Sequence, residues 1–306
     1  MSETKPVIDT DPEILKRSAD ASLHAADETW IHVRAEFAAA DGDYDKLMST
    51  LRPQGPYGYT IQPQINPDGT VRAPILTTWD DIRTAYEQVR GRSDLLSSES
   101  LIEIRGTWYT FQEAVSVGHV KGEPEPSPGT HLIGMFPVGS SAGITGELIW
   151  PWVPREMLGK GSAPAEPVTD PIRLRRNLLS LHDHYLEALA RGDLESLVAT
   201  MHDDVQSGVR DYVAESGTLN QLEGKDANRA YYASFFDKFE VLSVDLLDRV
   251  VQDWYVFAEV RLTVQPRGHD ERLAFHIAEF YVTANDGRFL VRIGHGTDPA
   301  HCNQRI

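Results

Sequence analysis

A six-residue pattern that occurs twice constrains the fold of this chain more than any other sequence feature. Residues 108–113 read Trp-Tyr-Thr-Phe-Gln-Glu, and residues 254–259, 146 positions further on, read Trp-Tyr-Val-Phe-Ala-Glu. Insertions in surface loops change the spacing between such matches without changing their order, so the sequence predicts one fold present twice. Further matches in the same order are Asp81 with Asp226, Tyr86 with Tyr231 and His131 with His276, each 145 apart, and Gly42-Asp43 with Gly192-Asp193, 150 apart.

Length and composition agree with two soluble domains. The chain has 306 residues, of which 41% are hydrophobic and 25% charged, and a domain of about 150 residues can bury its own core. A net charge of −17 disfavours nucleic acid and anionic membranes as partners. The N-terminus lacks a secretory apolar segment and no apolar run reaches the roughly 20 residues that span a bilayer, so we expect a cytoplasmic protein.

Neither a metal nor a cofactor is predicted. The only cysteine is Cys302, which excludes an intrachain disulfide and a cysteine-based metal cluster. The sequence contains no glycine-rich phosphate-binding motif and no nucleophile elbow. We therefore expect the partner to be a small apolar molecule that the protein handles without a cofactor, and further homo-oligomerisation stays open.

Composition shifts divide the chain into four parts. Residues 1–20 are predicted as a polar N-terminal tail and residues 21–154 as the first, more divergent domain. Residues 155–170 form the predicted linker, because the stretch 159–167 is rich in Gly, Pro and small residues. Residues 171–306 are predicted as the second domain, which we expect to bear the pocket.

Hydrophobic periodicity in the second domain predicts three helices followed by four strands. Apolar residues spaced by three or four positions between Leu174 and Leu189 predict a helix that ends at Gly192, and Asp193 is suited to cap the next helix. A third helix is predicted from Asp226 to about Lys238. Helices followed by a strand meander indicate an α+β fold with helices on one face of an antiparallel sheet. The predicted strands are 241–251, 254–264, 273–283 and 289–293, and the first domain follows the pattern more loosely.

The helix, Gly-Asp, helix segment at residues 185–198, followed by Met-His-Asp-Asp-Val at 201–205, resembles the opening of the NTF2-like superfamily. This superfamily includes ketosteroid isomerases and SnoaL-type polyketide cyclases. The resemblance covers nearly all of 170–298 and extends faintly over 21–152. It implies two tandem cone folds, each with three helices packed on a curved antiparallel sheet, that form an internal pseudo-dimer.

The same resemblance suggests where a catalytic site would lie. Tyr185 stands where ketosteroid isomerases place the tyrosine that hydrogen-bonds the developing oxyanion. Their base aspartate falls on Val209, with Asp211 two residues later, and their protonated aspartate falls on Ala278. Because the tyrosine position of the first copy is Ala35, we expect the active pocket in the second copy.

The predicted turn at residues 266–268 places Glu259 opposite His276 in neighbouring strands. The resemblance puts Ala278 on the concave side, and His276 therefore belongs there too. The opposite face is almost wholly apolar, so we expect the first copy to cover it. The residues expected to share the face of His276 and Glu259 are Tyr255, Phe257, Arg261, Ala274, Ala278 and Phe280.

A carboxylate beside an imidazole makes a general base that works near neutral pH. The hypothesis is that His276, supported by Glu259, moves a proton while Tyr185 donates to the oxygen that gains charge. Asp211 is a second candidate base. The alternative is that Glu259 and His276 form a structural pair, because the pair recurs as Glu113 and His131. The predicted substrate-binding residues are Tyr255, Phe257, Arg261, Phe280 and Tyr231.

The favoured function is a cofactor-independent isomerase or dehydratase-type lyase that uses proton transfer. Its substrate would be a largely apolar carbonyl or hydroxy metabolite, such as a polycyclic, aromatic or steroid-like compound. Two alternatives stay open. One is a non-catalytic small-molecule binding protein, and the other is a protein-assembly module with an exposed apolar patch.

Overall fold

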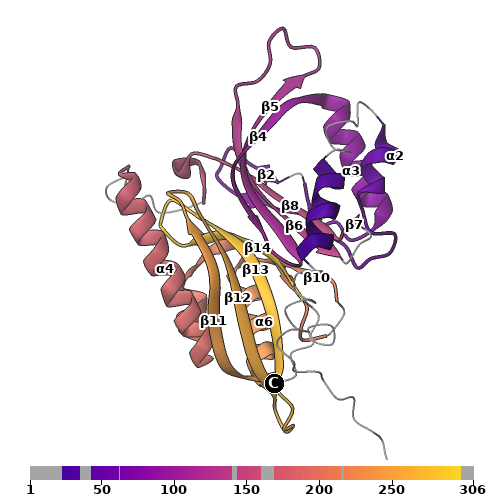
Figure 1. Cartoon of the computed structure of the whole chain (residues 1–306). Helices are drawn as coiled ribbons and strands as arrows, with labels where there is room; N and C mark the ends of the chain where they lie inside the picture. The colour runs from indigo at the N-terminus through magenta and orange to yellow at the C-terminus, as the bar shows by residue number, and fades with distance from the viewer. Residues whose placement is uncertain are drawn as a thin grey trace, which may run out of the picture.

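The computed structural model describes residues 23–34, 43–61, 63–139, 143–159, 169–214 and 217–297. Two curved sheets, one from each half of the chain, pack against each other and carry their helices on the outside (Figure 1). The predicted α+β class and the two cone-shaped domains are confirmed. Ala35, Gly42 and Cys302 lie outside these ranges, so the predictions that fall on these residues lie outside the described chain.

The first domain builds its main sheet in the order β1-β8-β6-β5-β4, with β7 paired to β6. Residues 23–34 are helical, and a separate hairpin of β2 and β3 precedes the longest helix. Strand β1 pairs with β8 in parallel, so the sheet is mixed and not purely antiparallel. The elements are α2 (Tyr44–Ser49), β1 (Gly58–Thr60), β2 (Gln64–Ile65), β3 (Val71–Arg72), α3 (Trp79–Arg92), β4 (Ser93–Arg105), β5 (Tyr109–Val120), β6 (Thr130–Gly139), β7 (Gly143–Ile144), β8 (Gly146–Pro151) and a 3₁₀ turn at Arg155–Met157.

The second domain has the order β10-β9-β14-β13-β12-β11. The three predicted helices and the four predicted strands are all present, with ends that differ by up to three residues. Strand β14 pairs with β9 in parallel, which again makes the sheet mixed. The elements are α4 (Pro171–Arg191), α5 (Leu194–Ala199), β9 (Met201–Arg210), β10 (Leu219–Glu223), α6 (Gly224–Lys238), β11 (Phe239–Val251), β12 (Tyr255–Pro266), β13 (Leu273–Thr283) and β14 (Phe289–Gly296).

Capping residues define the long helix α4 and its successor α5. Asp170 accepts the backbone N–H of Ile172, and Pro171 takes the first helical position, where a missing N–H costs nothing. Gly192 ends α4 with a φ of 64°, in the left-handed region that a glycine adopts without strain. Asp193 then accepts the N–H of Ser196 and starts α5. The predicted helix end and cap are therefore confirmed.

The two sheets share details that go beyond strand order. Strands β4 and β5 are paired with two register shifts, which leave Leu96 and Leu101 as bulged residues. Strands β11 and β12 have two such shifts at Leu242 and Leu247, each 146 positions after its counterpart. A bulge increases local twist and disrupts the ladder of an edge strand. The matching bulges agree with an origin of both sheets from one fold.

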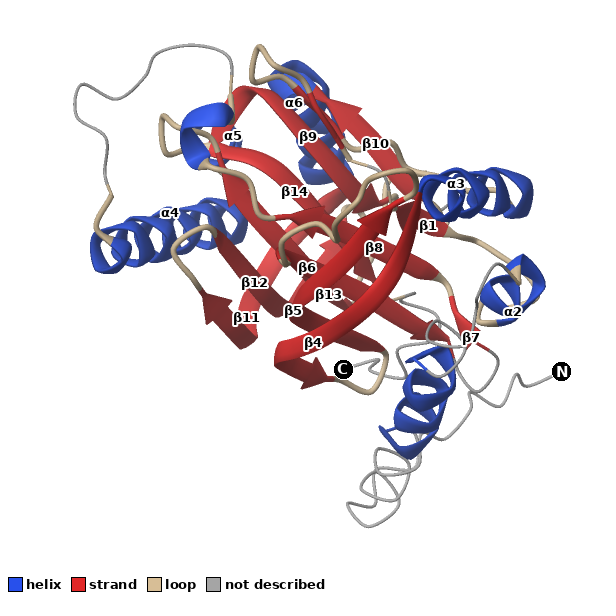
Figure 2. Cartoon of the chain, turned by 90° about the horizontal axis from the view of Figure 1, so that it is seen from above, coloured by secondary structure: helices blue, strands red, loops and turns tan. Residues whose placement is uncertain are grey.

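The two sheets lie one over the other in Figure 2, and the repeated six-residue pattern contributes to the core between them. Phe111 stacks on Phe257 with ring centroids 3.9 Å apart and planes 12° from parallel. The hydroxyl of Tyr109 donates to Glu259 at 2.9 Å, and that of Tyr255 donates to Glu113 at 2.8 Å. Each copy therefore makes to the other the contact that the other makes to it, as in a two-fold symmetric interface. The repeated pattern encodes the pseudo-dimer.

Two predictions about the β12–β13 hairpin are wrong. Glu259 lies opposite Ala278, and His276 lies opposite Arg261, because the turn is centred one residue later than predicted. This shift changes partners but preserves faces, since the side-chain period of a strand is two. The prediction that the face of Glu259 and His276 lies on the concave, pocket side of the sheet is also wrong. The side chains of Tyr255, Phe257, Ala278 and Phe280 pack against the first domain, while Val256, Leu262, Phe275 and Tyr281 pack under the helices.

Candidate functional site

The predicted pair of His276 and Glu259 forms, but at the interface between the domains. The His276 Nδ1 lies 2.9 Å from a carboxylate oxygen of Glu259. Glu259 also accepts from the Trp108 indole at 3.1 Å and from the Tyr109 hydroxyl, both in the first domain. Burial alone would raise the pKa of Glu259, but the hydrogen bonds from His276, Trp108 and Tyr109 bring it below its usual value. This setting agrees with the structural alternative for the pair, and the catalytic role stays a prediction.

The structure places the other predicted residues in different surroundings. Asp211 accepts the backbone N–H groups of Val213 and Ala214 at 3.0 and 2.9 Å, in a turn that follows β9. Arg261 donates twice to Asp245, at 3.1 and 2.9 Å. Two predicted residues, Tyr185 and Tyr231, line a pocket of the second domain. The predicted substrate-binding residues within the inter-domain core are Tyr255, Phe257 and Phe280.

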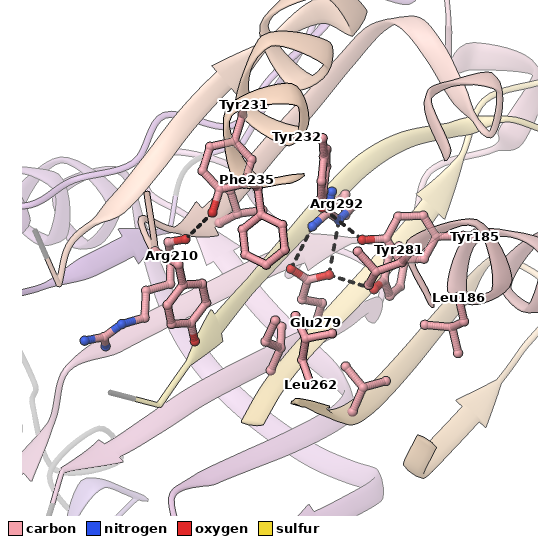
Figure 3. Close-up of a pocket in the computed structure, with 15 residues that line it drawn as sticks. Tyr185, Leu186, Arg210, Tyr231, Tyr232, Phe235, Leu262, Glu279, Tyr281 and Arg292 are labelled. Atoms are coloured by element: carbon pink, nitrogen blue, oxygen red, sulfur yellow. Dashed lines mark hydrogen bonds and ion pairs between the residues drawn. The ribbon is translucent and has the colours of Figure 1, made fainter. Parts of the chain in front are cut away.

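The pocket of the second domain lies between its helices and the concave face of its sheet (Figure 3). Its wall is mostly aliphatic and aromatic, and its cavity has a volume of about 30 Å³. Such a volume holds roughly one or two water molecules. The partly exposed side chains Leu186 and Tyr231 contribute to the wall. The lining residues are Tyr185, Leu186, Leu189, Val209, Arg210, Tyr212, Tyr231, Tyr232, Phe235, Val260, Leu262, Ile277, Glu279, Tyr281 and Arg292.

A buried polar network crosses this apolar wall (Figure 3). Arg292 donates from Nε and Nη2 to the two carboxylate oxygens of Glu279, both at 3.1 Å. Tyr281 donates to Glu279 at 2.6 Å. Within the described chain the Nη1 atom of Arg292 has no hydrogen-bond partner, although the residue is only 3% exposed. A buried donor without a partner costs about 1–3 kcal/mol, so a ligand oxygen at this atom would be stabilised.

Two tyrosine hydroxyls lie beside the ion pair. The Tyr185 and Tyr232 oxygens are 2.9 Å apart, and the Arg292 guanidinium lies 5.1 Å from the centre of each ring. Burial raises the pKa of Tyr185 and that of Tyr232 well above the usual tyrosine value, so both hydroxyls stay protonated. Burial alone would lower the pKa of Arg292, but the Glu279 carboxylate raises it, so the guanidinium stays charged. The wall therefore presents hydrogen-bond donors next to the carboxyl group of Glu279.

Sequence reasoning missed Glu279 and Arg292, although a signal was present. Each is a charged residue within an otherwise apolar strand, and a charge in such a position is buried and therefore paired. Gly294, the partner of Glu279 on β14, makes room for the pair, because a Cβ there would collide with the Glu279 side chain. Tyr232 follows Tyr231, a predicted substrate-binding residue, on α6. Sequence spacing alone does not show that Tyr232 lies near Tyr185.

The architecture and this pocket define a class of protein: two α+β domains with curved sheets, packed sheet to sheet, with a lined cavity between the helices and the sheet of the second domain. Comparison with protein families gives a more specific result, since residues 182–291 match the family model described as the SnoaL-like domain. The match covers the pocket of the second domain, except that Arg292 follows directly after it. No curated protein matches the sequence.

Solved structures with a similar fold include an LEH-like epoxide hydrolase from M. tuberculosis, at 13% identity and a TM-score of 0.34, covering 40% of this chain and 84% of that one. An NTF2-like protein of unknown function from Burkholderia pseudomallei has 18% identity and a TM-score of 0.36, covering 42% of this chain and 97% of that one. Bal32a, from a soil-derived mobile gene cassette, has 17% identity and a TM-score of 0.35, covering 43% of this chain and 98% of that one.

In the part of the chain that the structure describes, no helix is both long and apolar enough to cross a membrane. Among the same residues, no three or more His, Cys, Asp or Glu side chains gather as a metal ion would require.

Proposed function

We propose that the SnoaL-like domain is a cofactor-independent isomerase or dehydratase-type lyase that transfers a proton on a carbonyl or hydroxy compound with an apolar body. The proposal rests on hydrogen-bond donors and a carboxylate that lie together on one wall of an apolar pocket. Tyr185 and Arg292 supply the donors, and Glu279 supplies the carboxylate. Isolated polar groups in an apolar pocket are typical of small-molecule sites.

The donors suit an oxygen that gains negative charge during the reaction. In the Tyr185–Tyr232 pair one hydroxyl donates to the other, so the second hydroxyl keeps a proton for a ligand. The Nη1 atom of Arg292 adds a charged donor. A positioned donor of this kind contributes about 3–4 kcal/mol to a transition state with an oxyanion. The substrate carbonyl or hydroxyl oxygen would therefore lie against Tyr185 and Arg292.

Glu279 is the group we propose as the proton acceptor, in place of His276. It is the one carboxylate among the described residues that line this pocket. Three hydrogen bonds from Arg292 and Tyr281 hold it in a fixed orientation. A carboxylate can act as a general base when the substrate is held beside it, as in ketosteroid isomerase. Glu279 supplies such a carboxylate at the wall of this pocket.

The small cavity implies that binding involves movement. With about 30 Å³ available, an apolar metabolite must displace part of the wall. Leu186 and Tyr231 are the natural candidates, because they are partly exposed and belong to two different helices, α4 and α6. Closure over the substrate would then exclude water from the proton transfer.

Deuterium exchange tests the proposal without a known substrate. The probe is 1-tetralone, an apolar bicyclic ketone with acidic protons next to its carbonyl, followed by proton NMR in D₂O. We expect the wild-type protein to accelerate exchange. Tyr185→Phe should lower the exchange rate due to this pocket about 100-fold, as the loss of an oxyanion donor does. Tyr57→Phe, which removes a hydroxyl bonded to the Arg52 carbonyl, is the matched control. If wild type and Tyr185→Phe exchange equally, the proposal fails.

The non-catalytic alternative has one observation in its favour. Both oxygens of Glu279 already accept hydrogen bonds from Arg292, and one accepts from Tyr281 as well. A carboxylate held in this way can serve as the anchor for a binding-site arginine. In that case Tyr185→Phe weakens the binding of 1-tetralone, measured by calorimetry. Neither the wild type nor any variant then exchanges the protons of 1-tetralone faster than buffer does.

A further inference from the structure

The first domain contains a far larger cleft than the second. Its volume is about 1030 Å³, and it lies between the helical segment 23–34, helix α3 and the strands β4, β5, β6 and β8. Figure 1 shows β4 continuing from the end of α3 and arching with β5 opposite the helices of this domain. Trp30, Val33, Phe136 and Ile149 give the cleft apolar walls, and several serine side chains of β4 line it as well. A cleft of this size accommodates a whole metabolite.

One buried carboxyl group, that of Glu147 on β8, lines this cleft. Its residue is 5% exposed. The Tyr86 hydroxyl of α3 donates a hydrogen bond to it, and within the described chain Glu147 forms no ion pair. A buried carboxyl without a cationic partner is costly to ionise, so such groups are retained where a proton must be gained and lost.

The position of Glu147 corresponds to that of Arg292 in the second domain. The offset of 145 residues that relates His131 to His276 and Tyr86 to Tyr231 also relates Glu147 to Arg292. Both residues lie on the strand that pairs in parallel with the strand that comes first in the sequence of its sheet, β1 or β9. Glu279, the partner of Arg292, has Gly134 as its counterpart at the same offset. The two pockets therefore have opposite charges at one equivalent site, and the carboxyl in the first domain lacks the arginine that neutralises Glu279.

A second tyrosine lies close to Glu147. Tyr59 of β1 is its register partner in the parallel pair, and its hydroxyl is fully buried with no hydrogen-bond partner in the described chain. A buried hydroxyl without a hydrogen-bond partner destabilises the folded protein, unless a ligand or a bound water forms the missing hydrogen bond. Glu147 therefore has Tyr59 beside it on the neighbouring strand and a hydrogen bond from Tyr86 of α3.

The electrostatics agree with a group that gains and loses protons near neutrality. Burial raises the pKa of Glu147 to about 7, although the hydrogen bond from Tyr86 and the charge of Arg90 act in the opposite direction. Burial also raises the pKa of Tyr86 and that of Tyr59 well above the usual value, so both stay neutral donors. At pH 7 comparable fractions of Glu147 are protonated and ionised, which is the condition under which one group both takes and returns a proton.

We propose that the first-domain cleft is a second active site, in which Glu147 takes a proton from a neutral, largely apolar carbonyl compound, exchanges it with solvent and returns a proton to the same compound. The C–H bond next to the carbonyl breaks as the O–H bond of Glu147 forms, and the reverse transfer restores the carboxylate. Nothing else is consumed. A neutral substrate fits because an anion would be repelled by the ionised carboxylate in this acidic protein.

The cations near the cleft do not contradict this choice of substrate. Arg34 is engaged with Glu103 at 3.4 Å, and Lys121 lies 3.5 Å from Asp94. The charge of Arg90 acts on Glu147 itself. The serine hydroxyls of β4 can hydrogen-bond a carbonyl or hydroxyl group of a neutral ligand, while Trp30 and Phe136 pack on its apolar body.

The first test measures 1-tetralone exchange in D₂O with a protein that carries Tyr185→Phe, so that the pocket of the second domain contributes little. We expect residual exchange above buffer, rising with pH around a midpoint near 7. Adding Glu147→Gln should lower this residual rate about 100-fold, since positioned acid–base groups contribute 10²- to 10⁴-fold. Glu99→Gln, an exposed carboxyl of β4, is the matched control and should leave the rate unchanged. Absence of residual exchange, or residual exchange that survives Glu147→Gln, overturns the proposal.

A second measurement does not depend on the choice of ketone. Infrared difference spectra between pH 5 and pH 9 should contain the carbonyl band of one buried protonated carboxyl group, lost with a midpoint near pH 7 and missing in Glu147→Gln. Tyr86→Phe should move the midpoint upward, because it removes a hydrogen bond to the ionised form. If Glu147 is already ionised at pH 5, the proposal is wrong. Because this site and the Tyr185 pocket lie in different domains, either can fail without the other.

Discussion

Replacing Phe257 with alanine tests the packing of the two domains. Phe257 and Phe111 are fully buried and stack at 3.9 Å across the interface. A buried phenylalanine withdraws roughly 200 Å² from water, worth about 5 kcal/mol at roughly 25 cal/mol per Å². Large-to-small substitutions of this type cost about 3–5 kcal/mol when measured. We expect Phe257→Ala to lower the free energy of unfolding by that amount, with urea titration followed by circular dichroism as the assay.

A double-mutant cycle isolates the contact itself. Phe111→Ala and Phe257→Ala should be non-additive by about 0.5–1.5 kcal/mol, the amount expected for a stacked aromatic pair. Phe111→Ala combined with Phe289→Ala is the control, because Phe289 belongs to the separate core under the helices. Residues that do not touch should be additive within about 0.5 kcal/mol. Additive effects for Phe111 and Phe257 would mean that the sheets do not meet through the repeated pattern, and the reasoning would be refuted.

Two further predictions concern local features. Gly192→Ala should lower the free energy of unfolding by about 1 kcal/mol, seen as a lower Tm, because alanine is strained at a φ of 64°; an unchanged Tm would contradict the assigned helix end. Glu259 has a pKa below its usual value in the folded protein, so it stabilises the fold above the unfolded pKa of about 4.5 and this contribution is lost as the pH falls below that value. Between pH 5 and pH 3 the wild type should therefore lose more stability in urea titrations than Glu259→Gln, and equal losses would count against the interface network.

The sequence predicted the elements well because their signals are local. The apolar spacing up to Leu189, the glycine at 192 and the cap at Asp193 each act within a few residues. The strands of the second domain were predictable for the same reason. The parallel pairing of β14 with β9 could not be read locally, since β9 precedes β14 by about 90 positions and no turn joins them.

The faces of the sheet were harder to assign than its strands. Alternation separates the side chains of β12 into two sets, but it does not say which set meets helices and which meets another domain. Glu259 made its face look like a polar pocket, whereas its partners Trp108 and Tyr109 lie about 150 residues away in the sequence. The positions of Glu279, Arg292 and Glu147 in their sites likewise depend on contacts between residues that are far apart in the sequence. The only local sequence signal was a charged residue within an apolar strand.

We propose that this chain catalyses proton transfer, with Tyr185 as a donor in the second domain. The most direct measurement is the rate of 1-tetralone deuterium exchange by the wild-type protein and by Tyr185→Phe, both in a Glu147→Gln background that leaves the second-domain pocket alone. We predict exchange well above buffer, reduced about 100-fold by Tyr185→Phe. Exchange at the rate of buffer in both proteins, with 1-tetralone shown to bind, would contradict the claim and leave a binding protein in its place.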